Sequence, residues 1–83
     1  MSKNVTVYTT NNCKFCAMVK QYFDTKGVAY DVVNVEEHPE RQKEVLELSG
    51  MLSVPVTNVV DENGSSKVIV GYNIAELNAA VAA

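Results

Sequence analysis

The only two cysteines of the chain, Cys13 and Cys16, lie three positions apart. A thiolate at one position can attack a substrate disulfide, and a second thiol close by can then resolve the mixed disulfide. Residues 5–9 before the pair are β-branched or aromatic, and residues 15–23 after it carry apolar side chains at helical spacing. The pair is therefore predicted to lie at a strand-to-helix junction, where a C-x-x-C pattern indicates a redox motif.

The predicted start of the helix gives the two cysteines different roles. Unpaired N–H groups and the partial positive charge of a helix N-terminus stabilise a thiolate at Cys13, and Lys14 adds a nearby cation. We therefore expect the pKa of Cys13 to lie below the free-thiol value of about 8.5. Cys16 lies one turn further into the helix, where it is less exposed, and is predicted to resolve the mixed disulfide.

Two other interpretations of the cysteine pair stay open. A structural disulfide is one, although a bridge that closes so short a loop constrains the unfolded chain little. A metal carrier is the other, although a zinc site needs about four ligands and the chain offers two cysteines and His38. We expect no metal site within one chain, and an iron–sulfur cluster shared between two chains is the competing functional class.

The composition limits the size, the partners and the location of the protein. With 83 residues, of which 47% are hydrophobic and 20% charged, we expect a single domain over residues 1–83 with one small core. The net charge of −3 and the scattered basic residues argue against a nucleic-acid partner. Neither a bilayer-spanning apolar run nor a signal-peptide core is found in the sequence. We therefore expect a monomeric cytoplasmic protein with no membrane contact.

Seven elements are predicted, in the order β-α-β-α-β-β-α. The four strands are expected at residues 4–10, 28–35, 54–60 and 67–70. The three helices are expected at 13–26, from Pro39 to a terminator at Gly50, and from Ile74 onward after an Asn73–Glu76 capping box. Asn63-Gly64 predicts an antiparallel hairpin, and the first two strands should be parallel neighbours joined by a right-handed crossover.

The sequence also predicts which other side chains are buried and which are exposed to solvent. Apolar residues expected in the core or on inward helix faces are Tyr8, Phe15, Met18, Val19, Tyr22, Phe23, Val45, Leu48, Leu52, Ile74, Leu77 and Val81. Acidic residues expected on a solvated helix face are Glu36, Glu37, Glu40, Glu44 and Glu47. His38 is expected to be a solvated capping residue. Asn58 lies in a predicted central strand, where its side chain needs a buried partner that the sequence does not identify.

This order of elements and four short motifs resemble the glutaredoxin branch of the thioredoxin superfamily. The motifs are YTTNNC at residues 8–13, GVAY at 27–30, SVP at 53–55 and VGY at 70–72. The resemblance covers nearly the whole chain. It implies an α/β, thioredoxin-like fold, with a four-stranded mixed sheet in the order 2-1-3-4 and three helices on its two faces. The implied function is thiol–disulfide exchange by a dithiol oxidoreductase.

The resemblance also implies a substrate site around the cysteine pair. The peptide bond before Pro55 should be cis, so that the Val54 backbone can pair with an extended substrate. The expected substrate-binding residues are Lys14, Phe15, Val54, Pro55, Gly71 and Tyr72. For Tyr72, packing under the last helix and bordering the groove beside Cys13 are both open.

Three departures from glutathione-dependent glutaredoxins concern the reductant. Those proteins usually have Cys-Pro-Tyr-Cys, a Gly-Gly pair followed by Asp, and often a basic residue before the cysteines. This chain has Lys14-Phe15, Gly71-Tyr72-Asn73 and Thr10 at these places. The Gly-aromatic pair is more similar to NrdH-type redoxins, which donate electrons to ribonucleotide reductase and are recharged by thioredoxin reductase. We expect such a donor, without a prosthetic cofactor, and a glutathione-dependent glutaredoxin is the alternative.

Overall fold

The sheet is built around β1 (Asn4–Thr9), the strand that leads to the cysteine pair, in a computed structural model that describes residues 4–81. β1 pairs in parallel with β2 (Asp31–Asn34) and antiparallel with β3 (Val56–Val60). β3 pairs antiparallel with β4 (Ser66–Val70). The resulting order β2-β1-β3-β4 confirms the predicted mixed sheet, and the ends of the expected 1–83 domain lie outside the described residues.

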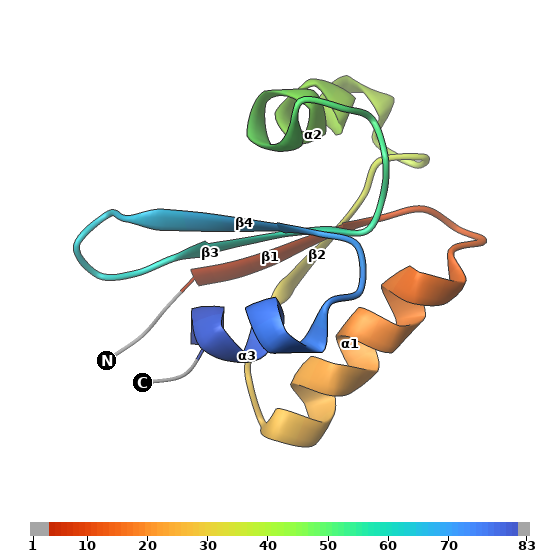
Figure 1. The fold of residues 1–83 in the computed structure, drawn as a ribbon. Helices are drawn as coiled ribbons and strands as arrows, with labels where there is room; N and C mark the ends of the chain where they lie inside the picture. The colour runs from red at the N-terminus through yellow and green to blue at the C-terminus, as the bar shows by residue number, and fades with distance from the viewer. Residues whose placement is uncertain (1–3, 82–83) are drawn as a thin grey trace.

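Helices lie on both faces of this sheet (Figure 1). α1 (Lys14–Lys26) and α3 (Ile74–Val81) cover one face. On the other face a 3₁₀ turn (Pro39–Arg41) continues into α2 (Gln42–Ser49). The order of strands and α-helices is the predicted one. Within the described part of the chain, no helix has the length and apolar character needed to cross a bilayer.

Two apolar clusters fill the two helix–sheet interfaces. The cluster between the sheet and the α1–α3 layer consists of Val5, Val7, Val19, Phe23, Val59, Ile69, Leu77 and Ala80. The cluster under α2 consists of Tyr8, Val33, Val35, Val45 and Val56. Successive strand residues alternate between the two faces, and so neighbouring residues such as Val7 and Tyr8 belong to different clusters.

Three of the four strands begin at a different residue than predicted. β2 begins at Asp31 rather than at residue 28, because the Val28 N–H donates to the Phe23 carbonyl (2.9 Å) and closes the end of α1. Gly27, in the left-handed region with φ of 72°, makes this turn possible. β3 begins at Val56, after Pro55, which has no N–H for the ladder. β4 begins one residue earlier than predicted, at Ser66.

Three apolar residues expected to face the core are on the surface instead. Phe15, in the first turn of α1, is 55% exposed, whereas Val19 and Phe23 further along the helix are buried. Leu52 lies beyond the end of α2 and is 60% exposed, because the left-handed Gly50 (φ 79°) ends the helix before it. Ile74 is the first residue of α3 and is 49% exposed, whereas Leu77 and Ala80 are buried. The predicted helical spacing of α3 is correct, but Ala80 rather than Ile74 lies with Leu77 on its inward face.

The predictions for two asparagine side chains, Asn73 before α3 and Asn58 in β3, have different outcomes. Asn73 caps α3 as predicted, since its Oδ1 accepts the Glu76 N–H (3.2 Å), and the Glu76 carboxylate accepts from the Asn73 side-chain Nδ2 (2.8 Å) instead of the backbone N–H of a regular capping box. In the central strand β3, the Asn58 Oδ1 and Thr57 Oγ1 atoms are buried without a hydrogen-bond partner among residues 4–81. The partner that Asn58 was expected to need is therefore not found there.

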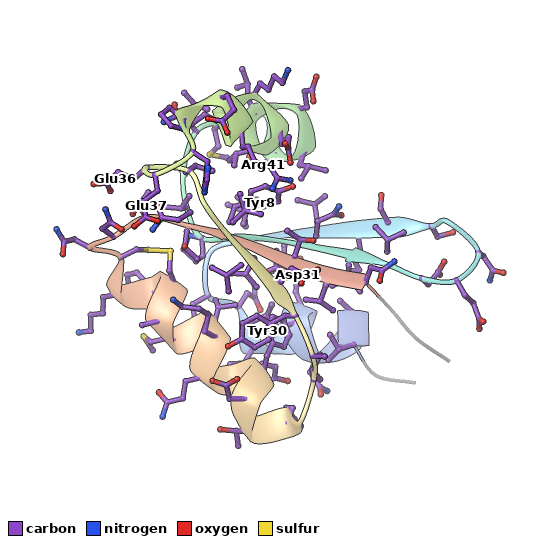
Figure 2. The ribbon with its side chains drawn as sticks, turned by 180° about the vertical axis from the view of Figure 1, so that it is seen from behind. Tyr8, Tyr30, Asp31, Glu36, Glu37 and Arg41 are labelled. Carbon is purple, nitrogen blue, oxygen red and sulfur yellow. A yellow bond between two sulfur atoms is a disulfide. The ribbon has the colours of Figure 1, made fainter. Side chains whose placement is uncertain are left out.

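The expectation of a solvated acidic face is wrong for Glu44. Its carboxylate accepts hydrogen bonds from the Tyr8 hydroxyl (2.8 Å) and from Arg41 Nε and Nη2 (2.8 and 2.9 Å). The bonds from Arg41 and Tyr8 lower the pKa of Glu44, while burial and the bond to Glu44 raise the pKa of Tyr8 to about 12. Figure 2 shows Tyr8 reaching from β1 toward Arg41, and the Tyr8–Glu44 hydrogen bond attaches α2 to the sheet.

Replacing Tyr8 by Phe should lower the free energy of unfolding by about 1–2 kcal/mol, because the buried hydroxyl bonds to a charged acceptor. Tyr30→Phe is the matched control, since its hydroxyl bonds to the Asp24 carboxylate (3.0 Å) at an exposed position and should lose less than about 0.5 kcal/mol. Urea denaturation measures both values. Equal losses for the two variants would contradict the role of Tyr8.

The Tyr8 contribution also has a defined pH window. The folded pKa of about 12 lies above the reference value of 10.0, so the neutral hydroxyl is favoured in the folded state. The stabilisation is complete below pH 10 and is lost as the pH rises through 12. The stability difference between the wild type and Tyr8→Phe should therefore narrow over this range, as denaturant midpoints at several pH values will test.

Candidate active site

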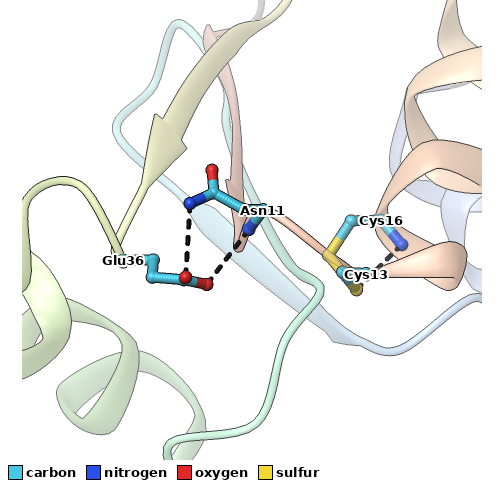
Figure 3. Close-up of a disulfide and its surroundings, with 4 residues drawn as sticks. All are labelled: Asn11, Cys13, Cys16 and Glu36. Carbon is cyan, nitrogen blue, oxygen red and sulfur yellow. Dashed lines mark hydrogen bonds between the residues drawn. A yellow bond between two sulfur atoms is a disulfide. The ribbon is translucent and has the colours of Figure 1, made fainter.

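The cysteine pair lies at the start of α1, directly after the loop that leaves β1 (Figure 3). Cys13 has an extended backbone (φ −116°, ψ 106°) and is the N-cap of α1. Its Sγ accepts a hydrogen bond from the Cys16 N–H at 3.1 Å, and the two cysteines form a disulfide. The predicted position at a strand-to-helix junction is confirmed, and the capping atom is the Cys13 sulfur itself.

The two cysteines differ in exposure. Cys13 is half-buried, whereas Cys16 is 1% exposed and lies on the inward face of α1 with Val19. Lys14 is exposed, and the Phe15 ring, 55% exposed, is among the most exposed large apolar side chains of the described residues. An incoming disulfide can therefore reach Cys13 more readily than Cys16.

The strand register brings the other predicted site residues to the same edge of the sheet. Tyr8 pairs with Val56, and Val56 pairs with Val70, so the end of β1, the start of β3 and the end of β4 lie side by side. The Val54–Pro55 peptide bond is cis, as the resemblance implied. Among the described residues no hydrogen bond engages the Val54 N–H or carbonyl.

The segment after β4 is attached to the Pro55 loop. The Gly71 N–H donates to the Pro55 carbonyl at 2.8 Å, and Gly71 has a φ of 79°, which favours glycine. Tyr72 is half-buried, packs against the α1–α3 cluster, and lines a surface hollow with Met18 and Tyr22. Of the two placements considered for Tyr72, packing on the α1–α3 side of the sheet is observed. Contact of Tyr72 with substrate stays a prediction.

No third metal ligand joins the cysteine pair within residues 4–81. The described His, Cys, Asp and Glu side chains form no group of three that could hold a metal ion. His38 lies exposed before the 3₁₀ turn, makes no capping hydrogen bond, and has its Nδ1 3.6 Å from the Glu40 carboxylate. A mononuclear site built on the pair and His38 is therefore not formed by these residues.

Sequence reasoning missed a hydrogen-bonded group beside Cys13. The Asn11 N–H and Nδ2 both donate to the Glu36 carboxylate, each at 3.2 Å (Figure 3). Asn34 Nδ2 donates to Asn11 Oδ1 at 2.7 Å. The available signal was topological. Because the carboxyl ends of two adjacent parallel strands meet at one edge, polar residues that follow both strands come close together.

Comparisons with known proteins give one consistent result. The family model described as Glutaredoxin matches residues 5–63. The glutaredoxin-like protein NrdH of Lactococcus lactis subsp. lactis is 42% identical over 52 residues, which cover 63% of this chain and 71% of that protein. An uncharacterized glutaredoxin-like 8.6 kDa protein in a rubredoxin operon of Clostridium pasteurianum is 31% identical over 74 residues, covering 89% and 92%.

Solved structures agree with these sequence relatives. The glutaredoxin from Archaeoglobus fulgidus superposes with a TM-score of 0.79 at 26% identity, covering 95% of this chain and 86% of that one. The NrdH-redoxin from Escherichia coli gives a TM-score of 0.76 at 25% identity, covering 96% and 97%. With its thioredoxin-like fold and its cysteine pair at the start of α1, the chain belongs to the glutaredoxin family and is a thiol–disulfide oxidoreductase.

Proposed function

We propose that the protein reduces disulfides in a protein substrate, with Cys13 as the nucleophile and Cys16 as the resolving thiol. The observation that carries this assignment is the difference between the two sulfurs. Cys13 is accessible and caps α1, with the Cys16 N–H 3.1 Å from its Sγ, whereas Cys16 is buried. The same N–H would donate to a Cys13 thiolate, and charge-assisted bonds of this kind stabilise the anion.

The exchange transfers two electrons in two steps. The Cys13 thiolate attacks one sulfur of the substrate disulfide, an S–S bond forms between them, and the other substrate sulfur leaves as a thiolate and takes up a proton. Cys16 then gives up its proton and attacks Cys13 Sγ, which releases the second substrate sulfur as a thiolate. The substrate is reduced to the dithiol, and the protein is left with the Cys13–Cys16 disulfide, the form observed here.

Substrate binding in this proposal relies mainly on backbone groups. An extended peptide can pair with the Val54 N–H and carbonyl, which no described residue engages, and this pairing does not depend on the peptide's sequence. Pro55 and Gly71 are joined by a hydrogen bond, and in this proposal they border the bound peptide next to Val54. Phe15 and Lys14 supply exposed apolar and cationic contacts beside Cys13. All of these residues come from one chain, and we propose that residues 1–83 work as a single-domain monomer.

We further propose that thioredoxin reductase recharges the protein and that its substrate is a ribonucleotide reductase. This is supported by the similarity to proteins named NrdH, one of which is described as having a thioredoxin-like activity profile. It is also supported by Thr10 and by the Gly71-Tyr72 pair, because a glutathione site gains from a basic residue and from a second glycine at these positions.

The cysteine roles predict an asymmetry between two serine variants. Cys16→Ser should leave the attack by Cys13 intact and accumulate a mixed disulfide with an oxidised protein substrate, whereas Cys13→Ser should form none. Mass spectrometry under non-reducing conditions measures the adduct. Accumulation in the Cys13 variant alone would mean that nucleophile and resolving thiol have been assigned in reverse.

The pKa of Cys13 in the reduced protein should lie below the free-thiol value of about 8.5 and below that of Cys16. Lys14→Glu should raise it by roughly 0.5–1 pH unit, because a cation close to the thiolate becomes an anion. Lys20→Glu, the same change further along α1, is the control and should have little effect. Thiolate absorbance against pH measures all three proteins, and a wild-type value at or above that of a free thiol would remove the helix-terminus argument.

Reductant choice should follow Thr10 and Tyr72. If each departure costs about 1–1.5 kcal/mol of binding, glutathione should bind on the order of a hundredfold less well than to a matched glutaredoxin. Thioredoxin reductase with NADPH should therefore reduce the disulfide faster than millimolar glutathione. Tyr72→Gly should shift the preference toward glutathione, and Tyr72→Phe, which keeps the ring, should not. Rapid turnover with glutathione and none with thioredoxin reductase would make the ordinary glutaredoxin assignment correct.

A further inference from the structure

The loop that carries Cys13 is held on one side by three polar residues, Asn11, Asn34 and Glu36, which we call the Asn11–Glu36 clamp. Asn11 makes three hydrogen bonds there: its N–H to Glu36 Oε1 (3.2 Å), its Nδ2 to Glu36 Oε2 (3.2 Å), and its Oδ1 with Asn34 Nδ2 (2.7 Å). Figure 3 shows the Glu36 carboxylate facing both nitrogens of Asn11, with the cysteines just beyond. Both carboxylate oxygens are therefore engaged by the residue two positions before Cys13.

Glu36 is itself fixed by the end of β2. The Val35 N–H donates to the Thr9 carbonyl at 2.9 Å, which extends the contact between the parallel strands by one bond. Asn34 Oδ1 accepts the N–H groups of Glu36 (2.9 Å) and Glu37 (3.1 Å), which turns the chain sharply after the strand. The acceptor side of the clamp is thus built on the sheet, and the donor side is the loop that ends at Cys13.

We propose that Asn11 and Glu36 are positioning residues for the reaction at Cys13, an inference that rests on the proposed role of Cys13 as nucleophile. Between the end of β1 and Cys13, only Asn11 has a side chain tied to another element, since Thr10 and Asn12 make no side-chain hydrogen bond among the described residues. Exposed polar contacts contribute little to overall stability. Their effect here is to hold Cys13 Sγ within reach of the Cys16 N–H.

A positioning effect and a simple charge effect of Glu36 have opposite signs. Lys14 follows Cys13 directly in the chain, and Glu36 and Glu37 lie across the clamp from it. A negative charge disfavours a thiolate, so removing it should lower the pKa of Cys13 and speed its reaction at neutral pH. Loosening the clamp should do the reverse, because Cys13 then loses its alignment with the N–H donor.

The chain supplies matched controls for both partners. Asn11→Ala removes two clamp bonds without changing charge, and Asn12→Ala makes the same substitution one residue nearer to Cys13. Glu36→Gln and Glu37→Gln remove the same charge from neighbouring exposed positions, of which only the first holds Asn11. Each change is made in a Cys16→Ser background, so that Cys13 is the only thiol and the backbone N–H of residue 16 is kept.

The measurements are the alkylation rate of Cys13 by iodoacetamide at pH 7, its thiolate titration, and the thermal unfolding midpoint. Loss of one stabilising bond to the thiolate corresponds to a decrease in rate of about 3–10-fold. We expect this decrease, with a raised Cys13 pKa, for Asn11→Ala and Glu36→Gln, and a change below about twofold for Asn12→Ala and Glu37→Gln. The Asn11→Ala/Glu36→Gln double variant should be no slower than the slower single variant.

The proposal is overturned if Asn11→Ala changes only the unfolding midpoint, or if it reacts as fast as Asn12→Ala. Faster reaction in both Glu36→Gln and Glu37→Gln would likewise overturn it in favour of a charge effect. Failure of the nucleophile assignment would look different, because the Cys16→Ser variant would then trap no substrate adduct whatever the state of the clamp. The two conclusions are therefore tested separately.

Discussion

The hydrogen-bonded register at one end of the sheet is the constraint on which the site depends. Tyr8 is paired with Val56, and Val56 with Val70, across three consecutive strands. The parallel pairing of Thr9 with Asn34 adds the end of β2 to the same edge. Four chain segments that are distant in sequence therefore leave the sheet together. The backbone pairing brings the cysteine loop, the cis Pro55 loop, the Gly71 turn and the Glu36 turn to one edge of the sheet.

The helices on the two faces of the sheet are attached by different interactions, and this difference affects how the site residues are positioned. α1 is attached through fully buried apolar residues such as Val19 and Phe23. The packing of these residues sets the distance between the sheet and the helix that carries Cys16. α2 is short, buries mainly Val45, and is attached in addition by the Tyr8–Glu44–Arg41 hydrogen bonds. A polar attachment fixes direction more strictly than apolar contact does, because it requires aligned donors and acceptors. It therefore orients α2 and the Pro55 loop that follows it.

What the sequence predicted correctly was encoded within a few neighbouring residues. The C-x-x-C spacing, the Gly27 and Gly50 helix ends and the Asn73–Glu76 capping box all act through contacts between residues close in the chain. What it missed depends on the partner across the fold. The role of Glu44 is set by Tyr8, 36 positions away, and that of Glu36 by Asn11, 25 positions away. In sequence, both glutamates look like part of an acidic run, because helical spacing says nothing of which donor faces them.

The same register explains how a negative charge can lie beside a site that needs a thiolate. An unpaired carboxylate near Cys13 would oppose ionisation, but both oxygens of Glu36 accept hydrogen bonds from Asn11, which stabilise the charge where it lies. On the other side, the Cys16 N–H at the start of α1 faces Cys13 Sγ directly. The Asn11 donors to Glu36 follow β1, and the Cys16 N–H that donates to Cys13 belongs to α1. The environment of the sulfur is thus determined by how these two elements are joined, and the short loop between them is where a change in geometry would alter the chemistry most.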